Sequence, residues 1–467
     1  MKSLLCLGVA SLLVLNCSGS EETSAEATAG TAGSGAVGEG GAAGDGAGTA
    51  GSAGASSECS GAGTLDLRLV LPAGVEGDVV VSGPSGYREP VTASVELPDL
   101  EGDYSIEAAR VKVFPEDERV GYVYVPEVSA STVCVGNEET TSVTVTYTLE
   151  PGSHRLWFTA QNGDQLVGAV AGDELEAGGE VVPSVGFGGS ASLITHGAVA
   201  IDASGNLWVA ANDGQITMRP MPTLGENDDA EPSVVLDISA ACARVIPCTA
   251  GGLAFDADGN LWAGIRDHLL RIDAADLATS GEPEPGVTIT GDELDGIEAL
   301  AFDAEGDLWV ASSNDGAILE YRGGRLSADD SEPADVRITA LTPSPVIANL
   351  SRPSGLAFDQ SGNLWVGYWS SNTLARFEPS ELAASAQLTP TVQLELSVLA
   401  LLESIAFDEQ GNLWAPGATG EIVGIARDQL TEDGDASVGV TTLSSEAFGS
   451  VLELAFYPAP SWSPIAN

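Results

Sequence analysis

A nine-residue sequence recurs five times in the C-terminal part of the chain and constrains the fold more than any other feature. Its consensus is Ala-Phe-Asp-x-x-Gly-Asn-Leu-Trp, and the copies end at Trp208, Trp262, Trp309, Trp365 and Trp414. Successive Trp residues are therefore 54, 47, 56 and 49 positions apart. A period of this length indicates supersecondary units that stack side by side, because no single unit can bury its apolar face alone.

Each copy predicts a tight turn between two strands. Ala-Phe-Asp ends one strand, the Gly and Asn tolerate the positive φ of a turn, and Leu-Trp starts the next strand. The Asp carboxylate can accept backbone N–H groups of the turn, and the Trp is expected to pack between neighbouring units. A second hairpin completes the units, at Gly214–Thr217, His268–Ile272, Ala317–Tyr321, Thr373–Phe377 and Glu421–Ile425. Several short strands per repeat are typical of propeller blades.

The two ends of this region carry complementary halves of the repeat. Leu156–Ala160 is a Leu-Trp half without its Ala-Phe-Asp, and Leu454–Tyr457 is an Ala-Phe half without its Leu-Trp. A ring closed by pairing the last strand into the first blade explains both halves and removes exposed sheet edges. The sequence therefore predicts an all-β chain with a six-bladed β-propeller over residues 151–467.

The Asp-x-x-Gly-Asn-Leu-Trp turn resembles that of NHL-like and gluconolactonase-like propellers and of virginiamycin B lyase. The resemblance covers about 310 residues and implies the fold. It does not fix an activity, since such rings include hydrolases, lyases and pure binding proteins.

Residues 58–150 read as short alternating strands, for example Leu65–Leu71, with no helical period. About seven strands in a segment of this length predict a β-sandwich. Its strand–Gly-Pro–strand–Leu-x-Gly-Asp-Tyr pattern resembles the immunoglobulin-like or carboxypeptidase-regulatory-like modules of secreted bacterial proteins. That resemblance implies a spacer or an accessory binding module.

The first 16 residues are predicted to be a signal peptide. Lys2 precedes the apolar run Leu4–Leu15, which is too short to span a bilayer but suits a signal-peptide core. The run ends at Cys17 and resembles a bacterial lipobox, which implies that Cys17 is lipidated and becomes the first residue of the mature protein. An ordinary secretory signal is the alternative.

Residues 17–57 are predicted to be a disordered, flexible tether, because residues 18–57 are almost entirely Gly, Ala, Ser, Thr and Glu and cannot bury enough apolar surface to offset their ordering entropy. The expected location is the bacterial cell envelope, with the protein exported and held by its lipid.

The charge excludes two classes of partner. Lys and Arg total 17 against 68 Asp and Glu, for a net charge of −51. Nucleic acids and anionic membrane surfaces are bound by clustered cations, so we expect no nucleic acid and contact with a membrane only through the lipid. An acidic surface of this kind attracts cations.

Cysteine usage supports export. Of six cysteines, Cys6 leaves with the signal peptide and Cys17 carries the lipid. The other four form one distant and one close pair, which predicts the disulfides Cys59–Cys134 and Cys242–Cys248 of an oxidising compartment.

The repeat also locates candidate site residues near the ring axis, four positions before each Phe. In chain order they are Gly197, Gly251, Glu298, Ser354, Glu403 and Leu452. Glu298 and Glu403 are therefore candidate ligands for Ca²⁺ or another divalent cation. Glu453 lies one residue after the axial position Leu452, and His196 lies one residue before the axial position Gly197.

Two aromatic residues outside the repeat are candidate ligand contacts together with His196. Tyr368 and Trp369 can present a platform to a sugar or a peptide at a blade loop, with core packing as the alternative for both.

Two functional hypotheses follow. In the first, the propeller of a monomeric, lipid-anchored protein binds or scaffolds a surface protein, a glycan or a small molecule without chemistry. In the second, the axis holds a divalent cation and hydrolyses lactone-like substrates. The lactonase resemblance implies a Glu, an Asn and an Asp around the metal, and the lyase resemblance implies two axial histidines. Only part of either set is present here, which favours the first hypothesis.

Overall fold

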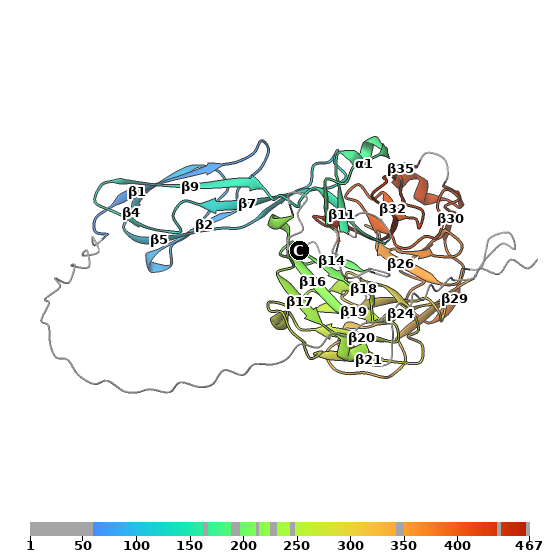
Figure 1. Ribbon diagram of the computed structural model, residues 1–467. Helices are drawn as coiled ribbons and strands as arrows, with labels where there is room; N and C mark the ends of the chain where they lie inside the picture. Colours follow the sequence, from blue (N-terminus) through green and yellow to red (C-terminus); the bar gives the residue numbers. More distant parts are fainter. Residues whose placement is uncertain are drawn as a thin grey trace, which may run out of the picture. The chain divides into compact units, whose positions relative to one another are not determined.

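The computed structural model describes residues 59–161, 167–187, 197–211, 214–224, 231–242, 248–341, 350–436 and 440–463. Nearly all regular structure in these ranges is β (Figure 1). The helical segments are short: α1 (Glu174–Ala177) and the 3-10 turns η1 (Pro84–Gly86), η2 (Met221–Thr223), η3 (Ser239–Cys242), η4 (Ala274–Asp276), η5 (Gly323–Arg325) and η6 (Arg427–Thr431). None of the helices in these ranges is long and apolar enough to cross a membrane.

The N-terminal strands form the predicted β-sandwich, with nine strands rather than about seven. One sheet has the order β4-β1-β9-β7-β6, and the other has the order β3-β2-β5-β8. The strands are β1 (Gly63–Val70), β2 (Val79–Ser82), β3 (Arg88–Val91), β4 (Val95–Leu100), β5 (Gly102–Ala108), β6 (Val111–Val113), β7 (Tyr122–Val128), β8 (Thr132–Val135) and β9 (Thr140–Leu149). Alternate residues of both sheets, such as Leu65, Val81 and Val143, form one buried core.

Six further sheets form the blades of the propeller, which Figure 1 shows from green through yellow to red in chain order. Blade 1 is β36 (Ser450–Tyr457), β10 (Arg155–Gln161), β11 (Val167–Ala171) and β13 (Val185–Phe187). Blade 2 is β14 (Val199–Ile201), β15 (Asn206–Ala210), β16 (Gln215–Pro220) and β17 (Val234–Asp237). Blade 3 is β18 (Ala250–Phe255), β19 (Leu261–Ile265), β20 (His268–Ile272) and β21 (Val287–Thr290).

The remaining blades each carry a fifth, short strand. Blade 4 is β22 (Ile297–Phe302), β23 (Leu308–Ser312), β24 (Ala317–Tyr321), β25 (Val336–Ala340) and β29 (Ala386–Leu388). Blade 5 is β26 (Pro353–Phe358), β27 (Leu364–Tyr368), β28 (Thr373–Phe377), β30 (Val392–Glu395) and β34 (Gly434–Asp435). Blade 6 is β31 (Ala406–Phe407), β32 (Leu413–Pro416), β33 (Glu421–Ile425), β35 (Thr441–Ser444) and β12 (Gly179–Glu180).

The ring closes as predicted. The last strand, β36, pairs antiparallel with β10, so that Trp157 lies opposite Ala455. The fifth strands β29, β34 and β12 come from the connection of the following blade and pair in parallel with the outer strand of the blade before it. These additions cover outer edges that would otherwise present unpaired backbone groups to other chains.

The turn of each repeat is held by one carboxylate, as the sequence predicts. In all five copies the Asp accepts the backbone N–H of the residue four positions later, at 2.9–3.1 Å. The same carboxylate also accepts the indole N–H of the Trp at 2.9–3.0 Å, which the sequence pattern did not predict. The hydrogen bond satisfies the one polar group of a large buried side chain.

Each anchored Trp packs edge-to-face on the Phe of the following blade. The ring centroids of these pairs are 6.0–6.5 Å apart: Trp208 with Phe255, Trp262 with Phe302, Trp309 with Phe358, Trp365 with Phe407 and Trp414 with Phe456. The predicted position of Trp between blades is therefore confirmed. Both predicted disulfides, Cys59–Cys134 and Cys242–Cys248, are also present.

Replacement of one turn carboxylate is expected to destabilise the ring. Asp408 is fully buried and accepts hydrogen bonds from the Trp414 indole and from both the backbone and side-chain amides of Asn412. Asp408→Ala leaves these donors buried without a partner, which should lower the free energy of unfolding by about 3 kcal/mol. Urea unfolding measures the effect. Asp276→Ala, on an exposed turn, is the control, and equal stability of the two variants would contradict the role of the turn.

Candidate functional site

The innermost strands are interrupted at the positions predicted to line the axis. In β18, β22 and β26 the antiparallel register shifts at Gly251, Glu298 and Ser354. Strand β36 shifts in the same way at Leu452. An extra residue of this kind is a β-bulge, which bends the strand and redirects side chains. The bulges therefore set which side chains reach the middle of the ring.

A pocket of about 220 Å³ lies at the bulged ends of these strands. We call it the axial pocket, since blades 1 and 4, which lie opposite one another in a six-membered ring, both contribute to it. Its lining residues are Gln161, Glu298, Ser313, Arg352, Ser354, Trp369, Leu401, Glu403, Ala418 and Ser450. The structure thus brings the predicted pair Glu298 and Glu403 together with Trp369.

A second cavity, of about 210 Å³, is lined by the Ala-Phe strands of the blades, and we call it the central channel. Its wall is mostly Ala, Leu, Val, Ile and Phe, and Glu453 is the charged residue among its described lining. Glu453 is thus part of the channel wall, although the repeat alignment placed it out of phase.

Glu453 stands in a layer of small residues. The other blades have Ala198, Gly252, Ala299, Gly355 and Ser404 at the same position, three residues before the Phe. The strands approach closely there: a Cβ on Gly355 would lie 2.8–2.9 Å from backbone atoms of Ser404 and Ile405. The sequence signal for Glu453 was a Glu at a position that holds Gly, Ala or Ser in the other five blades. This signal was missed.

The three carboxyl groups influence one another, and we call Glu298, Glu403 and Glu453 the axial carboxylates. Burial raises the pKa of Glu298 to about 7, with a further increase from Glu403 and an opposing effect of Arg352. Burial also raises the pKa of Glu453 well above its usual value, and the charges of the other two carboxylates add to this. Burial raises the pKa of Glu403, while a hydrogen bond from Trp369 and the charge of Arg352 lower it by a smaller amount. Each side chain keeps some exposed surface because it borders a cavity, but the surrounding protein leaves little water to solvate the charge.

Arg352 and Trp369 form the polar side of the axial pocket. The guanidinium of Arg352 lies 4.4 Å from the centroid of the Trp369 ring, and the indole N–H donates to Oε1 of Glu403 at 3.2 Å. Arg352 and Leu401 both have left-handed backbone angles, with φ of 70° and 61°. A side chain in this region costs about 1–3 kcal/mol, and such residues cluster at ligand sites.

Other predicted site residues do not reach the pocket or lie outside the described ranges. Tyr368 is 1% exposed and packs in the core between blades 4 and 5, which corrects the prediction that it forms a ligand platform with Trp369. Its strand is covered on both faces, so only the residue after the strand, Trp369, reaches the pocket. His196 and Cys17 lie outside the described residues.

Comparison with known proteins finds solved structures of low similarity. No protein-family model matches the chain, and no curated protein matches it. A streptogramin B lyase structure is 12% identical over 59% of this chain and 77% of its own, with a TM-score of 0.39. A catalytically inactive virginiamycin B lyase from Staphylococcus aureus with quinupristin is 10% identical over 80% and 89%, with a TM-score of 0.36. The WD40 β-propeller domain of Doa1 is 13% identical over 52% and 68%, with a TM-score of 0.35. Values this low say nothing of activity.

The axial carboxylates predict a loss of stability with rising pH. A carboxyl whose pKa is raised by folding binds its proton more tightly in the folded chain, so its stabilising effect is complete below the unfolded pKa and is lost as the pH rises through about 7 for Glu298. In chelator, Glu298→Gln should reduce the loss of unfolding free energy between pH 5 and pH 8 by on the order of 2–3 kcal/mol. Urea unfolding at both pH values measures this. Exposed Glu446→Gln is the control, and an unchanged pH dependence in Glu298→Gln would refute the assignment.

Proposed function

We propose that this protein is an exported, lipid-anchored binding protein whose propeller holds a small, positively charged ligand in the axial pocket without catalysing a reaction. The pair Glu298 and Glu403 in the axial pocket carries the proposal, and Glu453, in the wall of the neighbouring channel, is close enough to feel the charge of both. Among the described residues that line the axial pocket, Arg352 is the cation, so a bound cation supplies the missing counter-charge. Desolvated carboxylates gain most from such a partner, because their charge is poorly solvated without it.

The neighbouring polar groups support binding rather than chemistry. The hydroxyl of Ser354 donates to the backbone oxygens of Leu402 and Gly367, at 2.8 and 3.3 Å, so it is held as a structural group rather than paired with a base. The described lining residues of the pocket include no His, Cys or Lys that could serve as a base or a nucleophile. Trp369 adds an aromatic face, and the exposed Arg352 side chain that covers it is free to move aside for a cationic ligand.

The export signals support a location in the cell envelope. The predicted signal peptide of residues 1–16, the predicted lipid on Cys17 and the predicted tether of residues 17–57 support a location of the folded part outside the cytoplasm. The two disulfides, which are typical of an oxidising compartment, support the same location. In this location the natural partner is a surface protein, a glycan or a small molecule of the envelope.

The second candidate is a divalent-metal-dependent hydrolase of lactone-like substrates. The observation that favours it is the pKa of about 7 for Glu298, a value suited to general acid–base catalysis at neutral pH. Glu403 and Glu453 can then hold the metal through oxygen ligands, as Ca²⁺ prefers.

Binding at the axial pocket is tested by thermal melts of the mature chain with Ca²⁺ and, separately, with a simple diamine, in about 0.5 M NaCl to screen the general acidity. A ligand at 100 times its Kd should stabilise the fold by about 2.7 kcal/mol. Both cations should stabilise the double variant Glu298→Gln/Glu403→Gln less than they stabilise wild type, and they should stabilise Glu446→Gln as much as wild type.

Two results decide against the proposal. If neither cation stabilises the wild-type chain more than the double variant, the axial pocket is not a cation site. If a lactone or ester is hydrolysed, and the activity disappears both in chelator and in the double variant, the hydrolase is the correct function.

Lipid anchoring is tested by fractionation of cells that produce the full-length chain. Wild-type protein should sediment with membranes and dissolve in detergent, whereas Cys17→Ser should appear in the soluble extracytoplasmic fraction, because the substitution removes the thiol that would carry the lipid and a signal-peptide core of this length is too short to span the bilayer. Cys6→Ser is the matched control and should stay with the membranes. Equal distribution of the two variants would show that Cys17 carries no lipid.

A further inference from the structure

The turn of blade 4 differs in sequence from the turns of the other four copies of the repeat. In the other four copies the turn ends in an Asn, whose side-chain amide donates to the turn Asp at 2.8–3.2 Å. In blade 4 this residue is Asp307, and the turn Asp is Asp303. A carboxylate therefore replaces the hydrogen-bond donor, and two acidic groups face each other.

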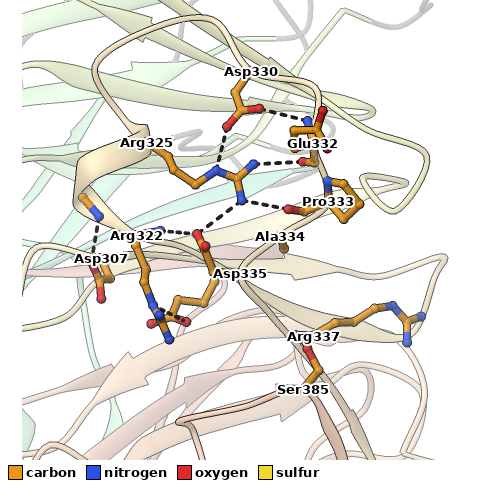
Figure 2. A network of polar contacts seen from close by, with 12 residues as sticks. Asp307, Arg322, Arg325, Asp330, Glu332, Pro333, Ala334, Asp335, Arg337 and Ser385 are labelled. Atoms are coloured by element: carbon orange, nitrogen blue, oxygen red, sulfur yellow. Dashed lines mark hydrogen bonds and ion pairs between the residues drawn. The ribbon is translucent and has the colours of Figure 1, made fainter.

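The Asn of the blade 3 turn both donates and accepts a hydrogen bond, and Asp307 keeps only the acceptor part. Its Oδ1 accepts the backbone N–H of Gly323 at 2.7 Å (Figure 2), as Oδ1 of Asn260 accepts that of Ala274 in blade 3. Its other oxygen takes the place of the amide nitrogen. Asp303 has its own donors, among them the Trp309 indole at 2.9 Å. The turn of blade 4 therefore contains one negative charge more than the turns of the other four copies.

A second substitution brings a third carboxylate to the same turn. The residue opposite the Trp on the next strand is Arg271 in blade 3 and Arg376 in blade 5, but Glu320 in blade 4. Glu320 is 5% exposed, and its Oε2 has no hydrogen-bond partner among the described residues. The nearest cationic atom is Nε of Arg322, at 3.5 Å, on a side chain that is 53% exposed.

These three residues meet. One carboxylate oxygen from each of Asp303, Asp307 and Glu320 can be chosen so that all lie within 4.8 Å of one another. We call them the blade-4 carboxylates. They border a cavity of about 580 Å³, which leaves room for water. Glu320 is 5% exposed and faces the two aspartates, so a negative charge on it gains from a further cation.

The nearby Arg325 is committed elsewhere, as Figure 2 shows. It donates to Asp330 at 2.6 Å, to Asp335 at 3.3 Å and to the backbone oxygens of Glu332 and Pro333. Its charge therefore stabilises the loop after β24 rather than the blade-4 carboxylates.

We propose that Asp303, Asp307 and Glu320 bind a hard divalent cation, with Ca²⁺ as the best match, at the turn of blade 4. Three carboxylate oxygens with water from the cavity suit Ca²⁺, which accepts six to eight oxygen ligands in irregular geometry. The site is separate from the axial pocket. Glu298 is near the start of β22 and Asp303 follows its end, so five residue-to-residue steps along an extended strand, roughly 16 Å, separate them.

The repeat supplies the decisive variant, Asp307→Asn, which restores the residue of the other four turns. Equilibrium dialysis of Ca²⁺ against the mature chain in about 0.5 M NaCl gives the stoichiometry. Tryptophan-sensitised Tb³⁺ luminescence reports a metal next to Trp309. Wild type should bind one more Ca²⁺ per chain than Asp307→Asn. In the Glu298→Gln/Glu403→Gln background, which removes a metal beside Trp369 in the axial pocket, Asp307→Asn should lower the Tb³⁺ signal at least tenfold. Without metal, Asp307→Asn should melt at or above the wild-type temperature, because the new amide donates to Asp303.

Two further variants separate this site from its alternatives. Glu298→Gln should keep the blade-4 Ca²⁺, whatever its effect at the axis. Asn260→Asp places a second carboxylate in the blade 3 turn, but Arg271 stands in place of the buried Glu there, so no new Ca²⁺ should bind. The proposal is overturned if Asp307→Asn binds as much Ca²⁺ as wild type, or if wild type binds none at this turn.

Discussion

The hydrogen bond from the Trp indole to the turn Asp is the interaction on which the ring depends. It occurs in five blades at 2.9–3.0 Å, with the Trp side chain at most 2% exposed. The same carboxylate closes the turn, so a single side chain fixes both the local backbone and the orientation of the indole. The oriented indole then meets the Phe of the next blade, and this contact sets the spacing of the blades around the ring.

The sites lie where the chain departs from this repeat. Glu453 is the long, charged member of a layer that is otherwise Ala, Gly and Ser. Asp307 replaces the Asn of the other four copies, and Glu320 replaces the Arg of blades 3 and 5. Each departure adds a negative charge that the other blades lack at that position. A conflict between local sequence and scaffold is expected at functional positions, since the surrounding repeats maintain the fold.

Much of the fold could be predicted from the sequence, but less of the site. The closure of β36 on β10, the Trp between blades and both disulfides were predicted. Glu298 and Glu403, chosen from their place in the repeat, line one pocket, and their role as metal ligands stays a prediction. Glu453 was missed, because strict alternation ignores the bulge that brings it to the channel wall. Tyr368 was assigned to a platform, because the sequence does not show that neighbouring blades cover both faces of β27.

What is local and repeated follows from the amino-acid sequence. Nine contiguous residues contain the Asp, the turn and the Trp, so the blade, its repetition and the complementary chain ends can be predicted from sequence. Which side chains meet depends on the packing of distant segments. Glu298, Glu403 and Glu453 come from three blades, whereas Asp303 lies in the turn after β22 and Glu320 lies on β24. Their mutual approach depends on β-bulges, ring closure and burial, which arise only when distant segments pack.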